Sequence, residues 1–510
     1  MSTLKPIRTA LVSVFSKDRI RPIVEKLHAA GVELLSTGGS RSFIEGLGIP
    51  CKAVEDLTGY PSILGGRVKT LHPKVFGGIL ARRDNEGDRN ELAQYEIPTI
   101  DLVIVDLYPF EATVASGASE QDIIEKIDIG GISLIRAAAK NFADTVIVAS
   151  DAQFAYLEGI LDRNGAQTTL EERRYLAQEA FAVSSAYDSA IFNWFSLTGG
   201  HTQEHLRMAI DGSMSLRYGE NPHQAARYFG KFDQLFEQLH GKEISYNNLL
   251  DIDAACALID EFDTTTVAVL KHNNACGLAS RGTVAEAWKD ALAGDPVSAF
   301  GGIIICNRRI EADAAEEISK IFFEVIIAPE YSDDALAILF QKKNRIVLRR
   351  KAVEVPAMKV RTVVGGVLMQ QPDDKAETTD DLKLVAGEQL NEAIVDDMLF
   401  ANKIVKHSKS NAIVLARNGQ LLASGVGQTS RVDALRHAIE KAKSFGFDLK
   451  GSTMASDAFF PFADCVEIAH EAGVEYVIQP GGSIRDTDSV EYCRNNGMTM
   501  VMTGFRHFRH

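Results

Sequence analysis

The segments 36–40 (STGGS) and 67–73 (RVKTLHP) combine residue types that can bind a phosphate group. The first follows an apolar run and precedes a helical pattern, so its small residues would leave the N–H groups of a helix start open to an anion. The second contains Arg67, Lys69 and His72, and arginine can bind a phosphate through two hydrogen bonds. A plain turn and a solvated basic loop are the alternatives.

A carboxylate, a guanidinium and an ammonium group occur together further along the chain. Asp128 precedes a Gly-Gly pair and a helical pattern that carries Ser133, Arg136 and Lys140 on one face. These charged groups could converge near the helix start, or they could form a surface stripe on an amphipathic helix. Tyr108 ends a predicted strand, where it could donate a hydrogen bond or line the rim of the sheet.

The segment 271–274 (KHNN) contains groups suited to acid–base chemistry. Histidine has an ordinary pKa near 6.5 and can accept a proton near neutrality, and a neighbouring lysine can stabilise a developing oxyanion. A lone histidine is more often structural, but this polar run would make a poor core. The loop 217–224 (RYGENPHQ) has no hydrophobic period, which favours a binding role.

Three more polar or aromatic clusters occur near the C-terminus. The segments 408–411 (SKSN) and 427–431 (GQTSR) flank a predicted strand pair, and 459–464 (FFPFAD) could stack a flat heterocycle or simply pack in the core. A zinc deaminase would need H/C-x-E followed by P-C-x-x-C, and neither string is present. The segment 201–205 (HTQEH) is not H-E-x-x-H, so we expect no catalytic metal.

The elements that must position these residues alternate between strand and helix in the N-terminal part. Strands are predicted at 10–15, 32–37, 102–107 and 145–149, with a helix over 18–30. This order favours a parallel, doubly wound sheet, which binds ligands at the carboxyl ends of its strands. A long helix with a capping box at Thr169 and Glu172 closes the unit near residue 198.

The remainder of the chain shows a weak internal duplication. Strands predicted at 264–270 and 411–416 each lead into a helical pattern, and each helix precedes an aspartate-and-phenylalanine segment, at 295–300 and 456–462. A structural repeat and a coincidence are equally compatible with this pattern. The segment 371–381 (QPDDKAETTDD) is predicted to be an acidic surface loop.

Composition excludes several classes of protein. The 510 residues are 45% hydrophobic and 24% charged, which excludes a wholly disordered chain. A net charge of −15 argues against a general nucleic-acid or anionic-membrane binder. Six scattered cysteines fit reduced thiols, and neither a membrane-length apolar run nor a signal-peptide core is present. We therefore expect a cytoplasmic, multi-domain protein.

Together these segments resemble one family, the bifunctional 5-aminoimidazole-4-carboxamide ribonucleotide (AICAR) transformylase/IMP cyclohydrolases. The strings that carry the resemblance, in family order, are RVKTLHP (67–73), DLYPF (106–110), DIGG with RAAAKN (128–141), RYGENPHQ (217–224), LKHNNACG (270–277), GQTSR (427–431) and SDAFFPF (456–462). Most are weak alone, but the set is specific and covers essentially the whole chain.

The resemblance implies an architecture and a set of partners. Residues 1–198 would form a methylglyoxal-synthase-like cyclohydrolase domain, and residues 199–510 a transformylase domain of two cytidine-deaminase-like repeats without zinc. It also implies a homodimer with transformylase sites across the subunit interface. The formyl donor would be 10-formyltetrahydrofolate, used as a co-substrate with no bound cofactor, and neither nucleic acid nor membrane is an expected partner.

The resemblance further assigns the cyclohydrolase residues. The catalytic set would be Lys69, Tyr108, Asp128 and Lys140, with Lys140 transferring a proton and Lys69 or Tyr108 stabilising the oxygen. The phosphate would be held by Ser36, Thr37, Gly38, Arg67 and Thr70. One departure is Phe15 in the turn 13–17 (SVFSK), where the family has a serine-rich turn.

For the transformylase, the resemblance implies that His272 accepts a proton from the attacking amine and Lys271 stabilises the tetrahedral state. Substrate would be bound by Arg217, Tyr218, Asn411, Arg431, Phe459 and Arg506. Glu324 stands where some relatives have an aspartate, which keeps the charge and changes the reach.

Two rival functions belong to other classes. The N-terminal domain could be a phosphate-binding effector module, leaving a monofunctional formyltransferase, but an effector site has little use for a carboxylate such as Asp128 beside Lys69 and Lys140. A nucleobase deaminase is the second rival, and the absent cysteine pair argues against it.

Overall fold

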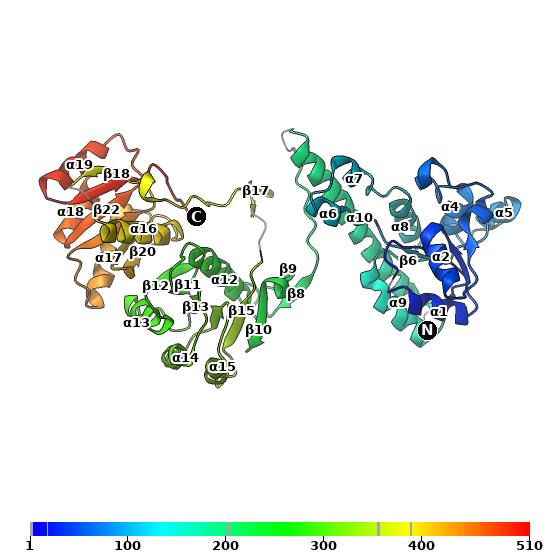
Figure 1. The fold of residues 1–510 in the computed structure, drawn as a ribbon, viewed down its shortest axis with the longest axis horizontal. Helices are drawn as coiled ribbons and strands as arrows, with labels where there is room; N and C mark the ends of the chain where they lie inside the picture. The colour runs from blue at the N-terminus through cyan, green and yellow to red at the C-terminus, as the bar shows by residue number, and fades with distance from the viewer. Residues whose placement is uncertain (1–3, 18, 201–203, 354–357, 388–389) are drawn as a thin grey trace. The chain divides into compact units, whose positions relative to one another are not determined.

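The computed structural model describes residues 4–17, 19–200, 204–353, 358–387 and 390–510. The chain divides into two compact units, Met1–Ile210 and Asp211–His510, which are considered separately here (Figure 1). Among the described residues, no helix has both the length and the apolar character needed to cross a membrane. Within those same ranges, no group of three or more His, Cys, Asp or Glu side chains is arranged to hold a metal ion.

The N-terminal unit is built on a five-stranded parallel sheet with the strand order β4-β3-β2-β5-β6. Its strands are β2 (Thr9–Ser13), β3 (Glu33–Ser36), β4 (Lys52–Ala53), β5 (Leu102–Val105) and β6 (Val146–Val148). A separate two-stranded ribbon pairs β1 (Lys5–Pro6) with β7 (Gln167–Thr168). The strands β2, β5 and β6 are short, almost wholly apolar and buried, as expected where helices cover both faces of a parallel sheet.

Two hydrophobic clusters show which helices cover which face. Alternate strand residues such as Val12 and Ile104 pack with α1 and α9, whereas Leu11 and Val103 pack with α4, α8 and α10. The helices are α1 (Arg21–Ala29), α2 (Gly38–Gly46), α3 (Val54–Thr58), α4 (Pro73–Leu80), α5 (Glu86–Gln94), α6 (Phe110–Ala115), α7 (Glu120–Ile124), α8 (Gly130–Lys140), α9 (Phe154–Asn164) and α10 (Leu170–Thr198), with 3₁₀ turns η1 (Leu64–Gly66) and η2 (Asp151–Gln153). The predicted doubly wound parallel sheet is confirmed.

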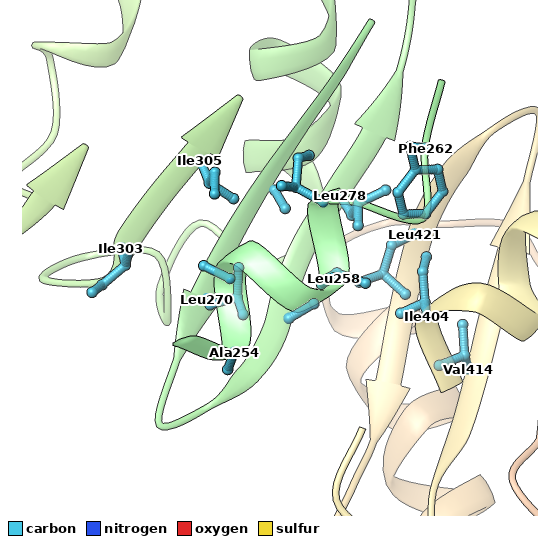
Figure 2. Close-up of a cluster of buried hydrophobic side chains, with 14 of the residues drawn as sticks. Ala254, Leu258, Phe262, Leu270, Leu278, Ile303, Ile305, Ile404, Val414 and Leu421 are labelled. Atoms are coloured by element: carbon cyan, nitrogen blue, oxygen red, sulfur yellow. The ribbon is translucent and has the colours of Figure 1, made fainter. Parts of the chain in front are cut away.

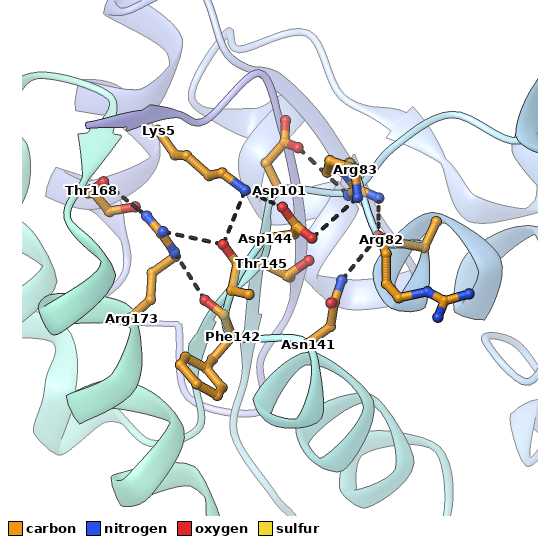
Figure 3. A network of polar contacts seen from close by, with 12 residues as sticks. Lys5, Arg82, Arg83, Asp101, Asn141, Phe142, Asp144, Thr145, Thr168 and Arg173 are labelled. Atoms are coloured by element: carbon orange, nitrogen blue, oxygen red, sulfur yellow. Dashed lines mark hydrogen bonds and ion pairs between the residues drawn. The ribbon is translucent and has the colours of Figure 1, made fainter. Parts of the chain in front are cut away.

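The long helix predicted at the end of this unit is also confirmed. In α10 the Thr169 hydroxyl accepts a hydrogen bond from the Glu172 N–H, and the Glu172 carboxylate accepts one from the Thr169 N–H. Arg173 in its first turn is buried and donates to backbone carbonyls of residues 142, 143 and 168 (Figure 3). This network fastens the start of α10 to the segment that follows α8.

The C-terminal unit contains one twelve-stranded mixed sheet in which two halves repeat the same strand order. One half runs β10-β15-β14-β13-β11-β12, and the other runs in mirror order as β20-β19-β21-β22-β23-β18. In each half an antiparallel hairpin is followed by three mutually parallel strands. The halves join where β12 pairs with β20.

The strands of this unit are β8 (Ser213–Leu216), β9 (Ala226–Phe229), β10 (Phe236–His240), β11 (Thr266–Lys271), β12 (Asn274–Ser280), β13 (Ile303–Cys306), β14 (Val325–Ala328), β15 (Ile346–Arg350), β16 (Lys359–Val363), β17 (Gly366–Gln370), β18 (Lys383–Ala386), β19 (Ile413–Arg417), β20 (Gln420–Gly425), β21 (Ser452–Ser456), β22 (Val474–Gln479) and β23 (Thr499–Met502). The helices are α11 (Phe232–Leu235), α12 (Tyr246–Ile259), α13 (Val284–Gly294), α14 (Ala312–Ile318), α15 (Asp333–Leu339), α16 (Glu392–Lys406), α17 (Arg431–Ser444), α18 (Asp464–Glu471) and α19 (Asp486–Asn495), with the 3₁₀ turn η3 (Thr379–Asp381).

One hydrophobic core continues across both halves of this sheet. Figure 2 shows Leu258 of α12 and Leu278 of β12 near Ile404 of α16 and Leu421 of β20, and all four side chains are essentially buried. Because α12 and α16 cover this shared face, the two halves are held together by apolar packing as well as by the β12–β20 pairing.

Strand directions decide which loops of this unit share an edge of the sheet. The consecutive strands β11, β12, β20 and β19 are antiparallel to their neighbours. The end of β11 and the start of β19 therefore lie at the same edge, although about 140 residues separate them in sequence.

The predicted acidic surface loop at 371–381 is confirmed over most of its length, since its residues apart from Glu377 are exposed or partly exposed and only the 3₁₀ turn η3 interrupts it. Glu377 is the exception, because it is 7% exposed and its carboxylate contacts the imidazole of His507. Asp373 contacts the other ring nitrogen of His507. An acidic composition predicted solvation, but a histidine far along the chain supplies a buried partner.

Candidate active sites

A cavity of about 650 Å³ lies at the carboxyl ends of β2, β3 and β5 in the N-terminal unit. This is the edge at which a parallel doubly wound sheet is expected to bind ligands. Six of the nine cyclohydrolase residues proposed from the sequence line it: Thr37, Arg67, Lys69, Thr70, Tyr108 and Asp128.

The start of α2 forms the cationic end of this cavity. A methyl group built on Gly38 would lie 3.7 Å from Nζ of Lys69, and one on Gly39 would lie 3.5 Å from Nζ of Lys17. Thr37 is the N-cap residue of α2 but makes no side-chain capping bond, so the N–H groups of the first turn are not used by it. Two ammonium groups and a helix start therefore face the same space, which suits a phosphate.

Ser36 and Arg67 have partners within the protein. Ser36 is completely buried and donates a hydrogen bond to the Val12 carbonyl at 2.7 Å, so it supports the strand pair and does not line the cavity. The Arg67 guanidinium forms an ion pair with Glu125 at the cavity wall. A ligand phosphate would have to share the Arg67 guanidinium with Glu125 or displace Glu125 from it. Lys17, which the sequence analysis did not assign, supplies a second cation here.

Two carboxylates also line this cavity. Burial raises the pKa of Asp128, although its carboxylate accepts a hydrogen bond from the Gly131 N–H at 2.5 Å. Burial likewise raises the pKa of Asp106, which accepts hydrogen bonds from the N–H groups of Phe15 and Ser16. A carboxyl whose pKa is raised toward neutrality can hold and release a proton during a reaction.

An aromatic pair and a lysine line the cavity beside these carboxylates. The rings of Phe15 and Tyr108 meet edge to face with centroids 5.8 Å apart, and Nζ of Lys126 lies 6.0 and 5.7 Å from the two centroids. The sequence analysis missed Lys126 and Asp106. The available signal was their position in the sequence, since Lys126 stands two residues before Asp128 and Asp106 two residues before Tyr108. Phe15 removes a hydroxyl from this turn and contributes a half-exposed ring.

The structure does not bring Lys140 or Arg136 to this cavity. Lys140 is the last residue of α8, whereas Gly130, Gly131 and Leu134 line the cavity, and the six residues from Leu134 to Lys140 rise about 9 Å along the helix axis. Lys140 and Arg136 instead line a second hollow of about 720 Å³ with Arg174. Arg136 and Lys140 are exposed, so of the two arrangements that the sequence left open the structure has the surface stripe, because a shared helix face does not shorten the distance along the axis. Figure 3 shows Asn141 next to this helix end, where it donates to the Ile79 and Ala81 carbonyls.

In the C-terminal unit, the candidate base lies on a two-residue turn between β11 and β12. Lys271 and Asn274 are paired, and both residues between them have left-handed backbones, with φ of 51° at His272 and 65° at Asn273. This is the backbone of the tight turns that match the twist of a hairpin. His272 is exposed at the tip, and the Lys271 ammonium donates to the Phe300 carbonyl at 2.8 Å.

A second cluster lies at the same edge of this sheet. Arg431 donates to the side chains of Asn411 at 2.9 Å and Asp457 at 2.7 Å, and to the Phe459 carbonyl at 3.3 Å. The Lys409 N–H donates to the Asn274 side chain at 2.9 Å, which ties the cluster to the turn.

Three buried polar atoms at this edge have no hydrogen-bond partner within the described part of the chain. They are Oδ1 of Asn273, Nε of Arg431 and Oδ2 of Asp457. Unsatisfied buried groups are costly, and a bound polar ligand would supply the missing partners. This edge therefore has the character of a ligand site.

The remaining candidates are less closely connected. Arg506 is exposed in the segment after β23, which reaches the same edge where the Ser410 N–H donates to the Arg509 carbonyl. Arg217 stacks on Tyr218 beyond β8, and the next contact along that loop is from Asn247 of α12 to the Glu220 carbonyl.

Glu324 immediately precedes β14 and forms an ion pair with Lys242 at 2.5 Å. The segment 201–205 lies partly outside the described residues, since residues 201–203 are not described.

Comparisons with known proteins identify the family of this chain. Residues 138–441 match the family described as the AICARFT/IMPCHase bienzyme, and residues 19–133 match the MGS-like domain. The chain is 66% identical to the bifunctional purine biosynthesis protein PurH of Bacteroides thetaiotaomicron, with all of both chains covered. It is 48% identical to PurH of Rhodospirillum rubrum over 99% of both chains, and 44% identical to PurH of Aquifex aeolicus over 98% of this chain and 100% of that one. The chain therefore belongs to the family of bifunctional AICARFT/IMPCHase purine biosynthesis enzymes.

Proposed function

We propose that this bienzyme closes the purine ring in residues 1–198 and transfers the formyl group in residues 199–510. As a member of its family, the chain is an AICAR formyltransferase and IMP cyclohydrolase that carries out the final steps of IMP synthesis. The observation that carries the division is the N-terminal cavity. It combines cations with a carboxyl of raised pKa entirely within residues 13–134, whereas the His272 turn belongs to the other unit.

The N-terminal cavity suits the dehydrative closure of formyl-AICAR. Its phosphate would lie at the start of α2 against Thr37, Gly38, Lys69, Arg67 and Thr70, with Ser36 supporting the strand beneath. The carboxamide nitrogen then attacks the formyl carbon, and the developing oxygen anion is stabilised by Lys69 or Tyr108. That oxygen leaves as water with one proton from the attacking carboxamide nitrogen and one from the formamide nitrogen. Because its pKa is raised, Asp128 can hold one of these protons and deliver it to the oxygen.

We assign no proton-transfer role to Lys140. It lies at the far end of α8 from the cavity, beside Arg136 and Arg174. A Lys140→Ala variant that loses cyclisation while its N-terminal unit remains folded would restore the role suggested by the resemblance.

The sheet edge around His272 suits formyl transfer from 10-formyltetrahydrofolate. The AICAR amine attacks the formyl carbon, His272 accepts the amine proton, and Lys271 stabilises the tetrahedral oxygen. The bond between the formyl carbon and N10 of the folate then breaks, and N10 takes up the proton that His272 accepted, so tetrahydrofolate leaves. The two substrates would be bound by Asn411, Arg431, Phe459, Arg506, Arg217 and Tyr218. The folate is consumed as a co-substrate, so this reaction calls for no resident cofactor.

We also propose that each half of the C-terminal unit is a cytidine-deaminase-like repeat without zinc. The repeated strand order and the shared α12–α16 face support this assignment. The deaminase rival is disfavoured because the chain belongs to the bienzyme family.

A homodimer is the proposed assembly, and the β16–β17 hairpin supports it. All residues of both strands are exposed, including Val360, Leu368 and Met369. An isolated two-stranded ribbon is marginally stable in water, and exposed apolar side chains of this kind mark interaction surfaces. Sedimentation of the chain and of a Leu368→Asp variant tests this proposal. A wild-type chain that remains monomeric at micromolar concentration would refute it.

One experiment tests the division of the two reactions. The chain is incubated with AICAR and 10-formyltetrahydrofolate, and tetrahydrofolate and IMP are followed together. His272→Ala should abolish formyl transfer yet cyclise supplied formyl-AICAR, and Asp128→Asn should do the reverse. If formyl-AICAR accumulates in the wild-type reaction and no IMP forms, the N-terminal unit is an effector module and the chain a monofunctional formyltransferase.

A further inference from the structure

We infer that Asp251 of α12 is a positioning residue for formyl transfer, because its carboxylate holds the turn that presents His272. This inference rests on the proposed role of His272 as proton acceptor. Asp251 does not belong to any of the motifs considered above, and it comes from a helix that precedes β11.

The contact is made to the backbone of the turn. Oδ1 of Asp251 accepts a hydrogen bond from the Asn273 N–H at 2.6 Å. Asn273 follows His272, and both have positive φ, a backbone conformation that residues other than glycine seldom adopt. Such backbones persist where the surrounding structure holds them in place.

A second contact holds the other side of the same turn. The Asn274 side chain donates to the His272 carbonyl at 2.8 Å and accepts from the Lys409 N–H at 2.9 Å. The turn is therefore fastened to α12 by Asp251 and to the opposite half of the sheet by Asn274. Without either contact, the turn that carries His272 would be held from one side only.

Asp251 is also placed to interact with His272 by charge. Burial raises the pKa of Asp251, while the Asn273 hydrogen bond and the charge of His272 act in the opposite direction. The Asp251 carboxylate is hydrogen-bonded to the N–H of Asn273, the residue after His272. The backbone that carries the imidazole is therefore linked to the position of this carboxylate.

Formyl transfer needs this precision because the base must lie within hydrogen-bond reach of the attacking amine. A displacement of about 1 Å in a reacting group can reduce a rate about 100-fold. Loss of the Asp251 contact is therefore expected to lower kcat for formyl transfer about 10- to 100-fold, with little change in the KM for AICAR.

Three variants of the full-length chain test the inference. Asp251→Ala removes the acceptor, whereas Asp251→Asn keeps an oxygen that can accept from the Asn273 N–H. Asp253→Ala is the matched control, because Asp253 is an exposed aspartate of the same helix. We expect Asp251→Asn to stay within about threefold of wild type and Asp253→Ala to match it, as order-of-magnitude effects of a retained and an unrelated contact. Cyclisation of supplied formyl-AICAR is the internal control and should not change.

Full formyl transfer by Asp251→Ala would overturn the inference, and so would equal losses in Asp251→Ala and Asp251→Asn. If Asp251→Ala does not fold, hydrogen exchange of wild type decides. The Asn273 amide should be protected, and an unprotected amide would overturn the inference.

His272→Ala separates this question from the proposed function. An active His272→Ala refutes the proposed function, whereas an inactive one beside a fully active Asp251→Ala refutes only the role of Asp251.

Discussion

Replacing His272 by glycine or by alanine should have the same effect on chemistry and different effects on stability. Both variants lack the imidazole, so both should lose formyl transfer by about 10²- to 10⁴-fold, the usual contribution of a general base. The backbone at this position has a φ of 51°, which glycine adopts freely and alanine does not.

The difference in stability follows from two opposing contributions. A left-handed backbone costs an L-residue about 1–2 kcal/mol relative to glycine. Glycine loses about 0.5–1 kcal/mol more backbone entropy than alanine on folding. The C-terminal unit of His272→Gly should therefore be about 0.8 kcal/mol more stable than that of His272→Ala, which is about a fourfold difference in the folding equilibrium.

The two tryptophans allow the C-terminal unit to be followed alone. Trp194 belongs to the N-terminal unit and Trp288 to the C-terminal unit, where it is 1% exposed. In a Trp194→Phe background, urea unfolding followed by Trp288 fluorescence should show a midpoint about 0.3 M higher for His272→Gly than for His272→Ala, given a slope near 3 kcal/mol/M.

Two outcomes would refute this reasoning. A His272→Ala variant as stable as His272→Gly would mean that the turn is not left-handed in solution. Substantial formyl transfer by either variant would mean that another group accepts the amine proton. Cyclisation of supplied formyl-AICAR should be normal in both, since His272 lies outside the N-terminal unit.

Three further predictions concern other contacts. Burial lowers the pKa of His507, but its two carboxylate partners outweigh burial and raise the pKa above 6.5. The stabilisation is therefore complete below pH 6.5 and lost as pH rises through the raised pKa, and His507→Leu should flatten this part of the urea-midpoint profile. In Gly131→Ala, the new methyl would lie 2.7 Å from the Asp128 carboxylate, so cyclisation should fall about tenfold while helix propensity keeps the N-terminal unit folded, as activity and circular dichroism would show. Arg431→Met leaves a fully buried Asp457 without its cation and should destabilise the C-terminal unit by about 3 kcal/mol in urea unfolding, with partial recovery on adding Asp457→Asn.

Local features of the fold could be predicted from the sequence because they depend on neighbouring residues. The apolar runs at residues 10–15 and 102–107 became β2 and β5, and the capping box of α10 forms between Thr169 and Glu172. The motifs proposed as catalytic also stand where strands end, which places them at a sheet edge once the sheet is parallel. Periodicity, capping and turn chemistry act over a few residues and can be seen in a single chain.

The candidate sites themselves were only partly predictable. Ser36 was expected at a phosphate, but its hydroxyl is used by the Val12 carbonyl. Lys140 shares a helix face with Ser133, yet two turns of helix separate it from the cavity. Lys126 and Asp106 were missed because their importance lies in what they face, which no local pattern records.

The sequence by itself determined the family, the alternating order of the N-terminal elements and the residue types available for acid–base chemistry. Only the tertiary structure decided which of those residues meet. His272 and Asn411 reach one edge because β11, β12, β20 and β19 alternate in direction, and Asp251 reaches the His272 turn because α12 packs on that sheet. Pairing between distant strands depends on the whole sheet, so the contacts that it creates are set by topology rather than by any segment of sequence.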